Sequence, residues 1–166
     1  GEQVKVYAES SVLPVLLQET EKIRNYEYLC NEQLASKLKA LLMEKRICAV
    51  LKRKFEGEKN IADIMSRLAK SRAASGLWGW WNNSEPVMWI SMHVIDALLE
   101  AEEAGYPSGL NKQLLTDYLI YQLEGMQGNA MTGHVQLLYR IGAKADYKKY
   151  IVSLDAWKGY RNMYEQ

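Results

Sequence analysis

Proline and β-branched runs are scarce in this sequence of 166 residues, which has only three prolines. Because β-branched runs are typical of strands and proline interrupts helices, this scarcity disfavours a sheet and favours helices. No apolar run approaches the roughly 20 residues that a membrane-spanning helix needs, and no secretion signal opens the chain. The 21 basic and 20 acidic residues leave a net charge of +1, so no broad basic surface is available to bind nucleic acid.

Cysteine is also scarce, since Cys30 and Cys48 are the only two. Both fall within one predicted helix, roughly 27 Å apart, whereas a disulfide joins Cα atoms less than about 7 Å apart. We therefore predict that the two cysteines are not joined. The cysteines and the two histidines, His93 and His134, lack the spacing of a zinc site, and no glycine-rich phosphate loop occurs. No metal and no other cofactor is expected.

Helical periodicity is present almost throughout the chain. Apolar residues recur at intervals of three and four, Gly57 separates the second expected helix from the third, and Gly105 and Gly142 stand where helices would end. No shift in composition marks a boundary, so we expect one all-α domain over residues 1–166, built of stacked helical hairpins. One face of the last helix is expected to hold Tyr147, Tyr150, Ile151, Leu154 and Trp157. The expected helices cover about 8–24, 30–54, 61–68, 87–104, 110–126, 130–141 and a segment from Asp146 onwards, with a tryptophan-rich loop over 75–86.

The stretch Cys30-Asn31-Glu32-Gln33 holds the residues with the clearest chemistry. A cysteine and a glutamine three positions apart can meet on one side of a helical turn. The thiolate can then attack the glutamine carboxamide and expel ammonia, which leaves an internal thioester. Such a bond lasts only where water is excluded, and Tyr26 and Tyr28 just before the cysteine could contribute an aromatic cover. The alternative is a buried cysteine at the start of a helix, without chemistry.

Three blocks of the sequence, taken in order, have a distinctive pattern. Residues 26–33 read Tyr-Glu-Tyr-Leu-Cys-Asn-Glu-Gln, residues 76–81 read Gly-Leu-Trp-Gly-Trp-Trp, and residues 89–106 run from Trp-Ile-Ser to Ala-Gly-Tyr. The first block resembles the thioester signature of alpha-2-macroglobulins and complement proteins, with Glu27 where relatives have proline and Leu29 where they have glycine. The second resembles the tryptophan-rich loop of the bacterial alpha-2-macroglobulin-like proteins, and the third resembles their next helix.

The resemblance implies both a fold and a function. The family's thioester domain is an α/α toroid, a ring of helical hairpins also seen in terpenoid cyclases, and the expected helices would supply about half of it. The chain would then be the N-terminal half of a thioester domain cut from a larger bacterial protein. That protein would be an endopeptidase inhibitor of the periplasm or cell envelope, and not an enzyme. It would capture target proteases by acyl transfer from Gln33, with Cys30 leaving. Its partners would be those proteases and the remaining domains of the parent chain.

Four other residues are candidates for roles around the thioester. By the resemblance, Glu32 and Asn31 tune the geometry of the helix start and do not react. In some relatives a histidine downstream of the thioester takes over the acyl group, and His134 falls in the corresponding region. The alternative for His134, which we favour, is a helix-start histidine with a local hydrogen bond. His93 lies inside the expected 87–104 helix, where packing is the expected role.

Two alternatives from other classes remain. One is a helical protein-interaction scaffold whose thioester has degenerated, because the signature departs from the family at two positions. The other, less favoured, is an α/α-toroid enzyme acting on glycans or isoprenoids. Such an enzyme would need carboxylates that face each other across a pocket, whereas Glu100, Glu102 and Glu103 fall within one helical turn. The tryptophans Trp78, Trp80 and Trp81 could stack on sugars, but such a cluster more often pins a loop to the core.

Overall fold

The computed structural model describes residues 12–24 and 30–164, with side chains for all of these except 21–24 and 157–164. Within these ranges every regular element is a helix, so the prediction of an all-α fold is confirmed. Residues 75–86 form a loop, as expected. The elements are α1 (Leu13–Arg24), α2 (Asn31–Val50), α3 (Glu58–Ser71), α4 (Met88–Glu103), α5 (Lys112–Glu124), the short 3-10 helix η1 (Gly128–Met131), α6 (Thr132–Arg140) and α7 (Tyr147–Tyr164).

Pro14 does not interrupt the first helix. α1 begins at Leu13, which places Pro14 in its first turn. The N–H groups of a first turn have no partner inside the helix, so a proline is tolerated there. The first hydrogen bond of the helix bypasses the proline, since the Leu16 N–H donates to the Val12 carbonyl at 3.0 Å.

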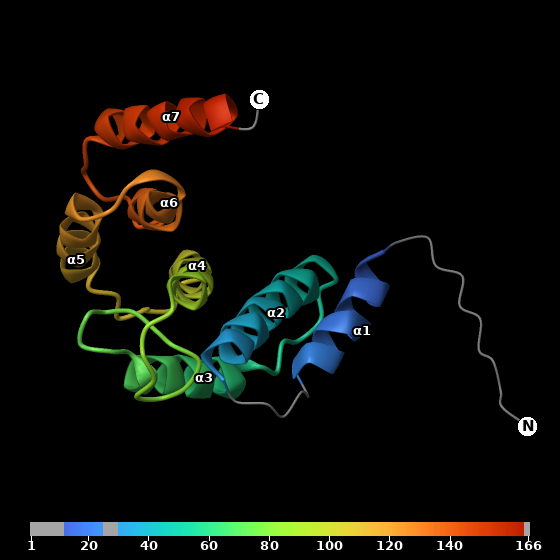
Figure 1. Ribbon diagram of the computed structural model, residues 1–166. Helices are drawn as coiled ribbons and strands as arrows, with labels where there is room; N and C mark the ends of the chain where they lie inside the picture. Colours follow the sequence, from blue (N-terminus) through green and yellow to red (C-terminus); the bar gives the residue numbers. More distant parts are fainter. Residues whose placement is uncertain (1–11, 25–29, 165–166) are drawn as a thin grey trace, which may run out of the picture.

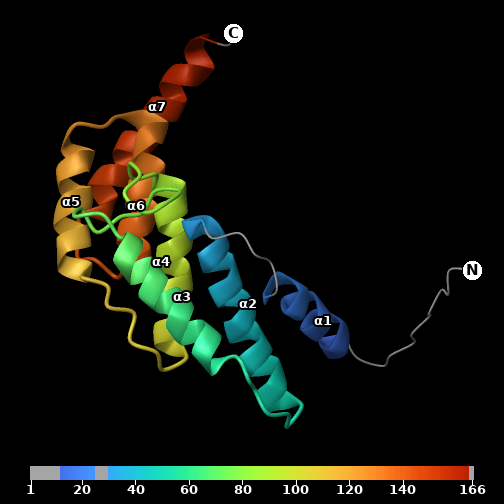
Figure 2. The same ribbon diagram turned by 90° about the horizontal axis from the view of Figure 1, so that it is seen from below.

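The helices follow one another along an open curve, with α1 and α7 at its two ends (Figures 1 and 2). α2 packs against α1, α3 and α4, and α4 in turn packs against α6. These contacts make α2, α4 and α6 a row of neighbours, while α3 and α5 lie on the outer side of the curve. Alternation of inner and outer helices is compatible with an α/α toroid. An open curve does not establish a closed ring, so the toroid stays a prediction.

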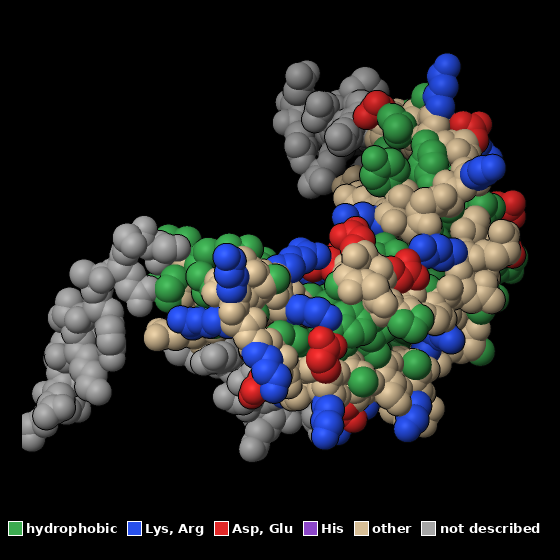
Figure 3. All heavy atoms as spheres, turned by 180° about the vertical axis from the view of Figure 1, so that it is seen from behind, with side chains coloured by type: hydrophobic (Ala, Val, Ile, Leu, Met, Phe, Trp, Pro, Cys, Tyr) green, Lys and Arg blue, Asp and Glu red, His purple; other side chains and the backbone are tan. Residues whose placement is uncertain are grey.

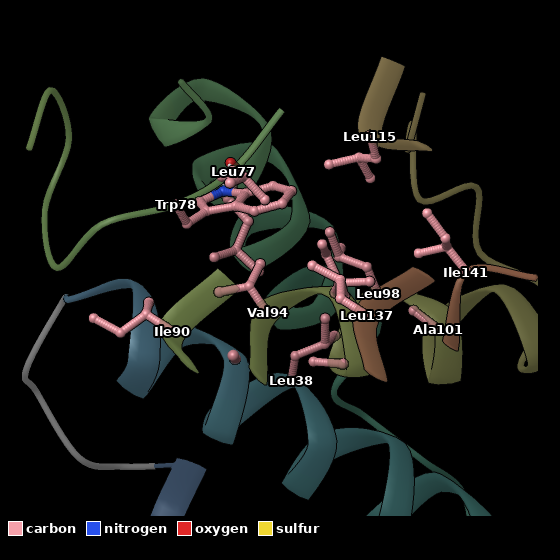
Figure 4. Close-up of a cluster of buried hydrophobic side chains, with 14 of the residues drawn as sticks. Leu38, Leu77, Trp78, Ile90, Val94, Leu98, Ala101, Leu115, Leu137 and Ile141 are labelled. Atoms are coloured by element: carbon pink, nitrogen blue, oxygen red, sulfur yellow. Dashed lines mark hydrogen bonds between the residues drawn. The ribbon is translucent and has the colours of Figure 1, made fainter. Parts of the chain in front are cut away.

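The core lies between these helices, and its largest fully buried side chain is a tryptophan. Trp78 is fully buried, and its Nε1–H donates to the Leu68 carbonyl at 2.7 Å. Figure 4 shows how side chains from α2, α4, α5 and α6 gather in the same cluster. The apolar stripe expected on the 87–104 helix is buried along the whole of α4: Ile90, Val94, Ala97, Leu98 and Ala101.

The last helix buries less of its apolar face than the sequence indicates. Tyr150 is buried, but Ile151 is 54% exposed, so the expectation that Ile151 belongs to the packed face is wrong. α7 lies at the end of the curve and packs against η1 and α6. A helix with neighbours on one side covers only a narrow stripe. The side chain of Trp157, expected on the same face, lies outside the described residues.

Both charge signs are present on the described surface. On the face drawn in Figure 3, Lys and Arg side chains are interspersed with Asp and Glu side chains. None of the helices described here combines the length and the apolar composition needed to cross a bilayer.

Ser91 on α4 fixes the backbone of Trp78. The Ser91 hydroxyl accepts a hydrogen bond from the Trp78 N–H at 2.9 Å and can donate to the Trp78 carbonyl, also at 2.9 Å. The same carbonyl accepts the N–H of Val87 at 2.9 Å. Because Ser91 is fully buried, water cannot replace these bonds.

Replacing Ser91 with alanine should lower the free energy of unfolding by about 1–3 kcal/mol, because the Trp78 N–H would stay buried without its acceptor. Ser153 on α7 is a matched control, since its hydroxyl also donates to a backbone carbonyl, that of Lys149 at 3.0 Å, but it is exposed. Ser153→Ala should change the free energy of unfolding by less than about 0.5 kcal/mol. Urea unfolding followed by tryptophan fluorescence measures both variants, and equal losses would contradict this role of Ser91.

Three helices end with a residue of positive φ just after the last turn. Gly105 (φ 90°) and Gly142 (φ 72°) occupy this position after α4 and α6. Lys52 (φ 53°) occupies it after α2, where the N–H of the next residue, Arg53, bonds to the Cys48 carbonyl at 2.8 Å. A residue with a Cβ atom is strained in this conformation, whereas glycine is not.

Replacing Lys52 with glycine should therefore raise the free energy of unfolding, by about 0.5–1 kcal/mol. Its neighbour Arg53 is also exposed and has no positive φ, so Arg53→Gly should give no gain. Thermal unfolding of the two variants compares them directly. A lower melting temperature for Lys52→Gly would show that the conformation carries no strain.

Candidate functional site

Cys30 and Gln33 lie together at the N-terminal end of α2. Cys30 is the N-cap, with an extended backbone at φ −70° and ψ 158°, and Gln33 is the third residue of the helix. The Cys30 thiol donates a hydrogen bond to Gln33 Oε1, with Sγ and Oε1 3.0 Å apart. Cys30 is 4% exposed. The thiol and the carboxamide are therefore in direct contact, with the thiol buried and Gln33 partly exposed.

This contact places the thiol beside the group that it would attack. Addition of the thiolate to the carboxamide carbon of Gln33 would give a tetrahedral intermediate, and loss of ammonia would then leave a thioester. The negative charge on the oxygen would develop at the positive end of the α2 dipole. The same spacing, an N-cap residue and a glutamine at the third helical position, is found in the capping box that stabilises many helix starts. Cys30 is not part of such a box, because its side chain makes no capping hydrogen bond.

Asn31 connects this turn to two other segments of the chain. Its Nδ2 donates to the Gly79 carbonyl at 2.9 Å, and its backbone N–H donates to the Trp80 carbonyl, also at 2.9 Å. Its Oδ1 accepts a hydrogen bond from the Ser71 hydroxyl at 2.6 Å. Asn31 is only 2% exposed, so its polar groups must find their hydrogen-bond partners in the protein and not in water. The start of α2 is thereby joined to the end of α3 and to the tryptophan-rich loop.

Gly79 has no room for a side chain. A Cβ atom at this position would lie 2.2 Å from the Glu85 carbonyl oxygen and 2.3 Å from the Ser84 hydroxyl oxygen. The loop therefore folds back on itself at Gly79, and the close approach leaves the Gly79 carbonyl facing Asn31. Sequence alone did not predict the contact between Asn31 and Gly79, because the two residues are 48 positions apart.

The tryptophans of the loop divide into two kinds. Trp78 is fully buried and pins the loop to the core, which is the role expected from the sequence. Trp80 and Trp81 are 45% and 54% exposed, so they do not have that role. Trp80 packs edge to face against Trp89 of α4, with ring centroids 5.2 Å apart, and Trp89 is 51% exposed. An exposed aromatic patch thus lies next to the turn that holds Cys30.

A second polar cluster lies one turn further along α2. Ser36 donates a hydrogen bond to Glu32 Oε1 at 3.1 Å, and its hydroxyl lies 3.0 Å from Nε2 of His93 on α4. The same ring nitrogen is 3.9 Å from Glu32 Oε1. In a Ser-His-acid triad the carboxylate holds the other ring nitrogen. The cluster therefore connects α2 to α4 but is not arranged as a catalytic triad.

Sequence reasoning gave His93 only a packing role and missed its contacts with Ser36 and Glu32. Burial, followed by the positive charge of Lys39, lowers the pKa of His93, while nearby carboxylates, first that of Glu32, act in the opposite direction. His93 is therefore neutral at pH 7. The sequence offered one partial signal, the four-residue spacing of Glu32 and Ser36 on a helix. Nothing in the pattern pointed to the histidine, which is 57 positions from Ser36.

His134 lies elsewhere, near the start of α6, and is 8% exposed. Burial lowers its pKa, and a backbone hydrogen bond with Ala130, four positions earlier, acts in the opposite direction. Its neighbour Gly133 faces Met88 and Met92 of α4. Within the described part of the chain no hydrogen bond joins His134 to Cys30 or Gln33. These surroundings favour the local role over that of an acyl acceptor.

The remaining candidates divide between the surface and the undescribed part of the chain. Tyr26 and Tyr28, proposed as the aromatic cover, lie outside the described residues. Glu100 and Glu102 on α4 lie in surface ion pairs, with Lys39 at 3.7 Å and with Lys112 at 2.9 Å. Among the residues that have described positions, no three of His, Cys, Asp and Glu are grouped so that they could hold a metal ion.

No protein-family model, no curated protein and no solved structure matches this chain. The family resemblance therefore rests on the three sequence blocks, and the chemistry rests on the contact between Cys30 and Gln33. What the protein does is inferred from these two observations together.

The two histidines predict a dependence of stability on pH. The pKa of His93 and that of His134 are lowered in the folded protein, so the unfolded chain binds protons more readily. Above a pH of about 6.5, which is the pKa of histidine in the unfolded chain, this difference in pKa costs no stability. As the pH falls from there towards the lower pKa values of the folded protein, the unfolded chain takes up protons first and the folded state loses stability. The free energy of unfolding should thus fall between pH 7 and pH 5.

Urea unfolding at several pH values measures this loss. The double variant His93→Asn/His134→Gln should lose less stability over the same interval than the wild type, because its two side chains do not titrate there. An unchanged pH dependence in the double variant would contradict the assignment.

Proposed function

We propose that this chain is the thioester-bearing part of a protease-trapping endopeptidase inhibitor of the alpha-2-macroglobulin-like type. The observation that carries the proposal is the 3.0 Å contact between the buried Cys30 Sγ and Gln33 Oε1 at the start of α2. The three sequence blocks, 26–33, 76–81 and 89–106, support the family assignment. The first two blocks also contact each other, because Asn31 bonds to the carbonyl groups of Gly79 and Trp80.

The thioester forms when the Cys30 sulfur replaces the amide nitrogen on the Gln33 side chain. Cys30 Sγ, as a thiolate, adds to the Gln33 carboxamide carbon. The carbon–nitrogen bond then breaks, and the nitrogen leaves as ammonia with the proton that came from the thiol and the two that it already held. The product is a thioester that links the two side chains across one helical turn. Burial of Cys30 supports its survival, since a thioester in contact with water hydrolyses.

The thioester is then the acylating group of the trap. When a protease cuts the bait region elsewhere in the parent protein, the parent rearranges and the thioester meets solvent. A lysine amine or a hydroxyl of the attacker adds to the Gln33 carbonyl carbon, and Cys30 leaves as a thiolate. The attacker ends in an amide or ester bond to Gln33. Because the group is consumed once and is not regenerated, the protein acts as an inhibitor and not as an enzyme.

The proposal includes the place of the chain in its parent. The row formed by α2, α4 and α6, with α3 and α5 outside it, supports a partial α/α toroid. Residues 1–166 would then be the N-terminal half of the thioester domain, completed by further helices of the parent. The partners are the captured proteases and the other domains of the parent, and the location is the periplasm or cell envelope.

A helical interaction scaffold without the thioester is the second candidate. Trp80, Trp81 and Trp89 expose about half of their surface beside the Cys30 turn. Exposed aromatic clusters of this kind are typical of surfaces that bind other proteins. A scaffold would use this patch and would have no need of the carboxamide of Gln33.

The intact mass of freshly purified protein, kept free of reductant, tests the thioester. We expect a mass lower than that of the sequence by one ammonia, and uptake of one methylamine at Gln33 with release of the Cys30 thiol. Cys30→Ser should abolish both effects. Cys48→Ser is the matched control, because Cys48 is also buried on α2 but lies near its other end, and it should leave both effects unchanged.

The opposite result has a definite consequence. The full sequence mass, a free Cys30 thiol and no methylamine uptake would mean that no thioester forms in these 166 residues. The same measurement on the full-length parent then decides. A second negative result there would overturn the trap and leave the scaffold.

A further inference from the structure

Hydrogen bonds made by Asn31 attach the start of α2 to the tryptophan-rich loop. Asn31 uses its side-chain amide for the Gly79 carbonyl, its backbone N–H for the Trp80 carbonyl and its side-chain oxygen for the Ser71 hydroxyl. Its side chain is almost wholly buried, so a broken bond would leave a polar group without water. Asn31 is also the residue directly after Cys30, so the two cannot move independently.

We propose that Asn31 is the positioning residue of the Cys30–Gln33 turn, and that its bonds to Gly79 and Trp80 control the access of solvent to Cys30. While these bonds hold, Cys30 stays at the N-cap with its thiol on Gln33. When the loop moves away from Asn31, the turn loses its attachment and Cys30 becomes exposed. The proposal concerns regulation of the same turn, and its consequence for acyl transfer rests on the function proposed above.

The loop is anchored in the core at Trp78, directly before the residues that bond to Asn31. Trp78 is held through its backbone by Ser91 and through its indole by the Leu68 carbonyl. Trp80 and Trp81, which follow, are about half exposed. The attachment to Asn31 therefore lies where the loop passes from the core to the surface. A displacement of the exposed half can reach Asn31 without disturbing Trp78.

An aspartate at position 31 separates this role from a general effect on the helix. A negative charge in the first turn of a helix is favourable, so Asn31→Asp should not unwind the rest of α2. The carboxylate cannot donate to the Gly79 carbonyl, however, its charge repels that oxygen, and its burial is costly, so the attachment to the loop should break. A positioning role thus predicts a more exposed Cys30, while Cys48 further along α2 stays protected.

The experiment measures the rate of alkylation by iodoacetamide at each cysteine, read by mass spectrometry of the separated peptides. Cys48 is the internal reference, because it is buried on the same helix. In Asn31→Asp the rate at Cys30 should rise about tenfold, since loss of a buried hydrogen bond raises the open population by roughly that factor. The rate at Cys48 should stay within about twofold of the wild type.

Two further variants complete the design. Ser71→Ala removes one of the three bonds without adding charge, and it should raise the rate at Cys30 in the same direction but less. Asn111→Asp is the matched control, because Asn111 caps α5 by accepting the Leu114 N–H, which an aspartate also does. This control should leave the rates at both cysteines unchanged.

The outcomes are distinct. An unchanged rate at Cys30 in Asn31→Asp, or equal increases at Cys30 and Cys48, would overturn the positioning role. If the wild type contains the thioester, Cys30 is not open to iodoacetamide, and the rate of methylamine uptake is measured instead, with the same expected acceleration. Because the alkylation assay works on a free thiol, the positioning role can be confirmed even if the thioester never forms.

Discussion

The hydrogen bonds of Asn31 are the constraint on which the candidate site depends. They hold the start of α2 against the end of α3 and against the loop before α4, three segments that share no sequence neighbourhood. The loop can accept them only because Gly79 lacks a Cβ atom and Trp78 is fixed to α4 and α3. The position and burial of Cys30 therefore depend on contacts with residues far away in the sequence, and not on the four-residue motif alone.

Much of the fold could be predicted from the sequence because helix formation is governed by local patterns. Periodicity predicts the all-α class and the order of the helices. The residues typical of helix ends predict the glycines that follow α4 and α6. The separation of Cys30 from Cys48 follows from helix geometry, and both cysteines are indeed free of disulfides. Ile151 could not be placed correctly, because the number of neighbours around α7 is a property of the whole arrangement.

The candidate site was predictable only where its contacts are local. Cys30 and Gln33 are three positions apart, so one helical turn brings them together. The attachment of Asn31 to Gly79 and the meeting of Ser36 with His93 span 48 and 57 positions. Both depend on how α2 packs against α4 and on the path of the loop between α3 and α4. Helix propensity and apolar periodicity do not predict contacts of this kind.

The place of Cys30 at the junction of loop and helix has a further consequence. Cys30 still has an extended backbone, while Gln33 is already helical, so the two side chains meet only while the first turn of α2 is wound. A free helix end frays at a small fraction of the free energy of global unfolding, but unwinding this turn also breaks the buried bonds of Asn31. The lifetime of the contact is therefore set by one helical turn together with its attachment to the loop. Warming should separate the thiol from the carboxamide before the core around Trp78 unfolds.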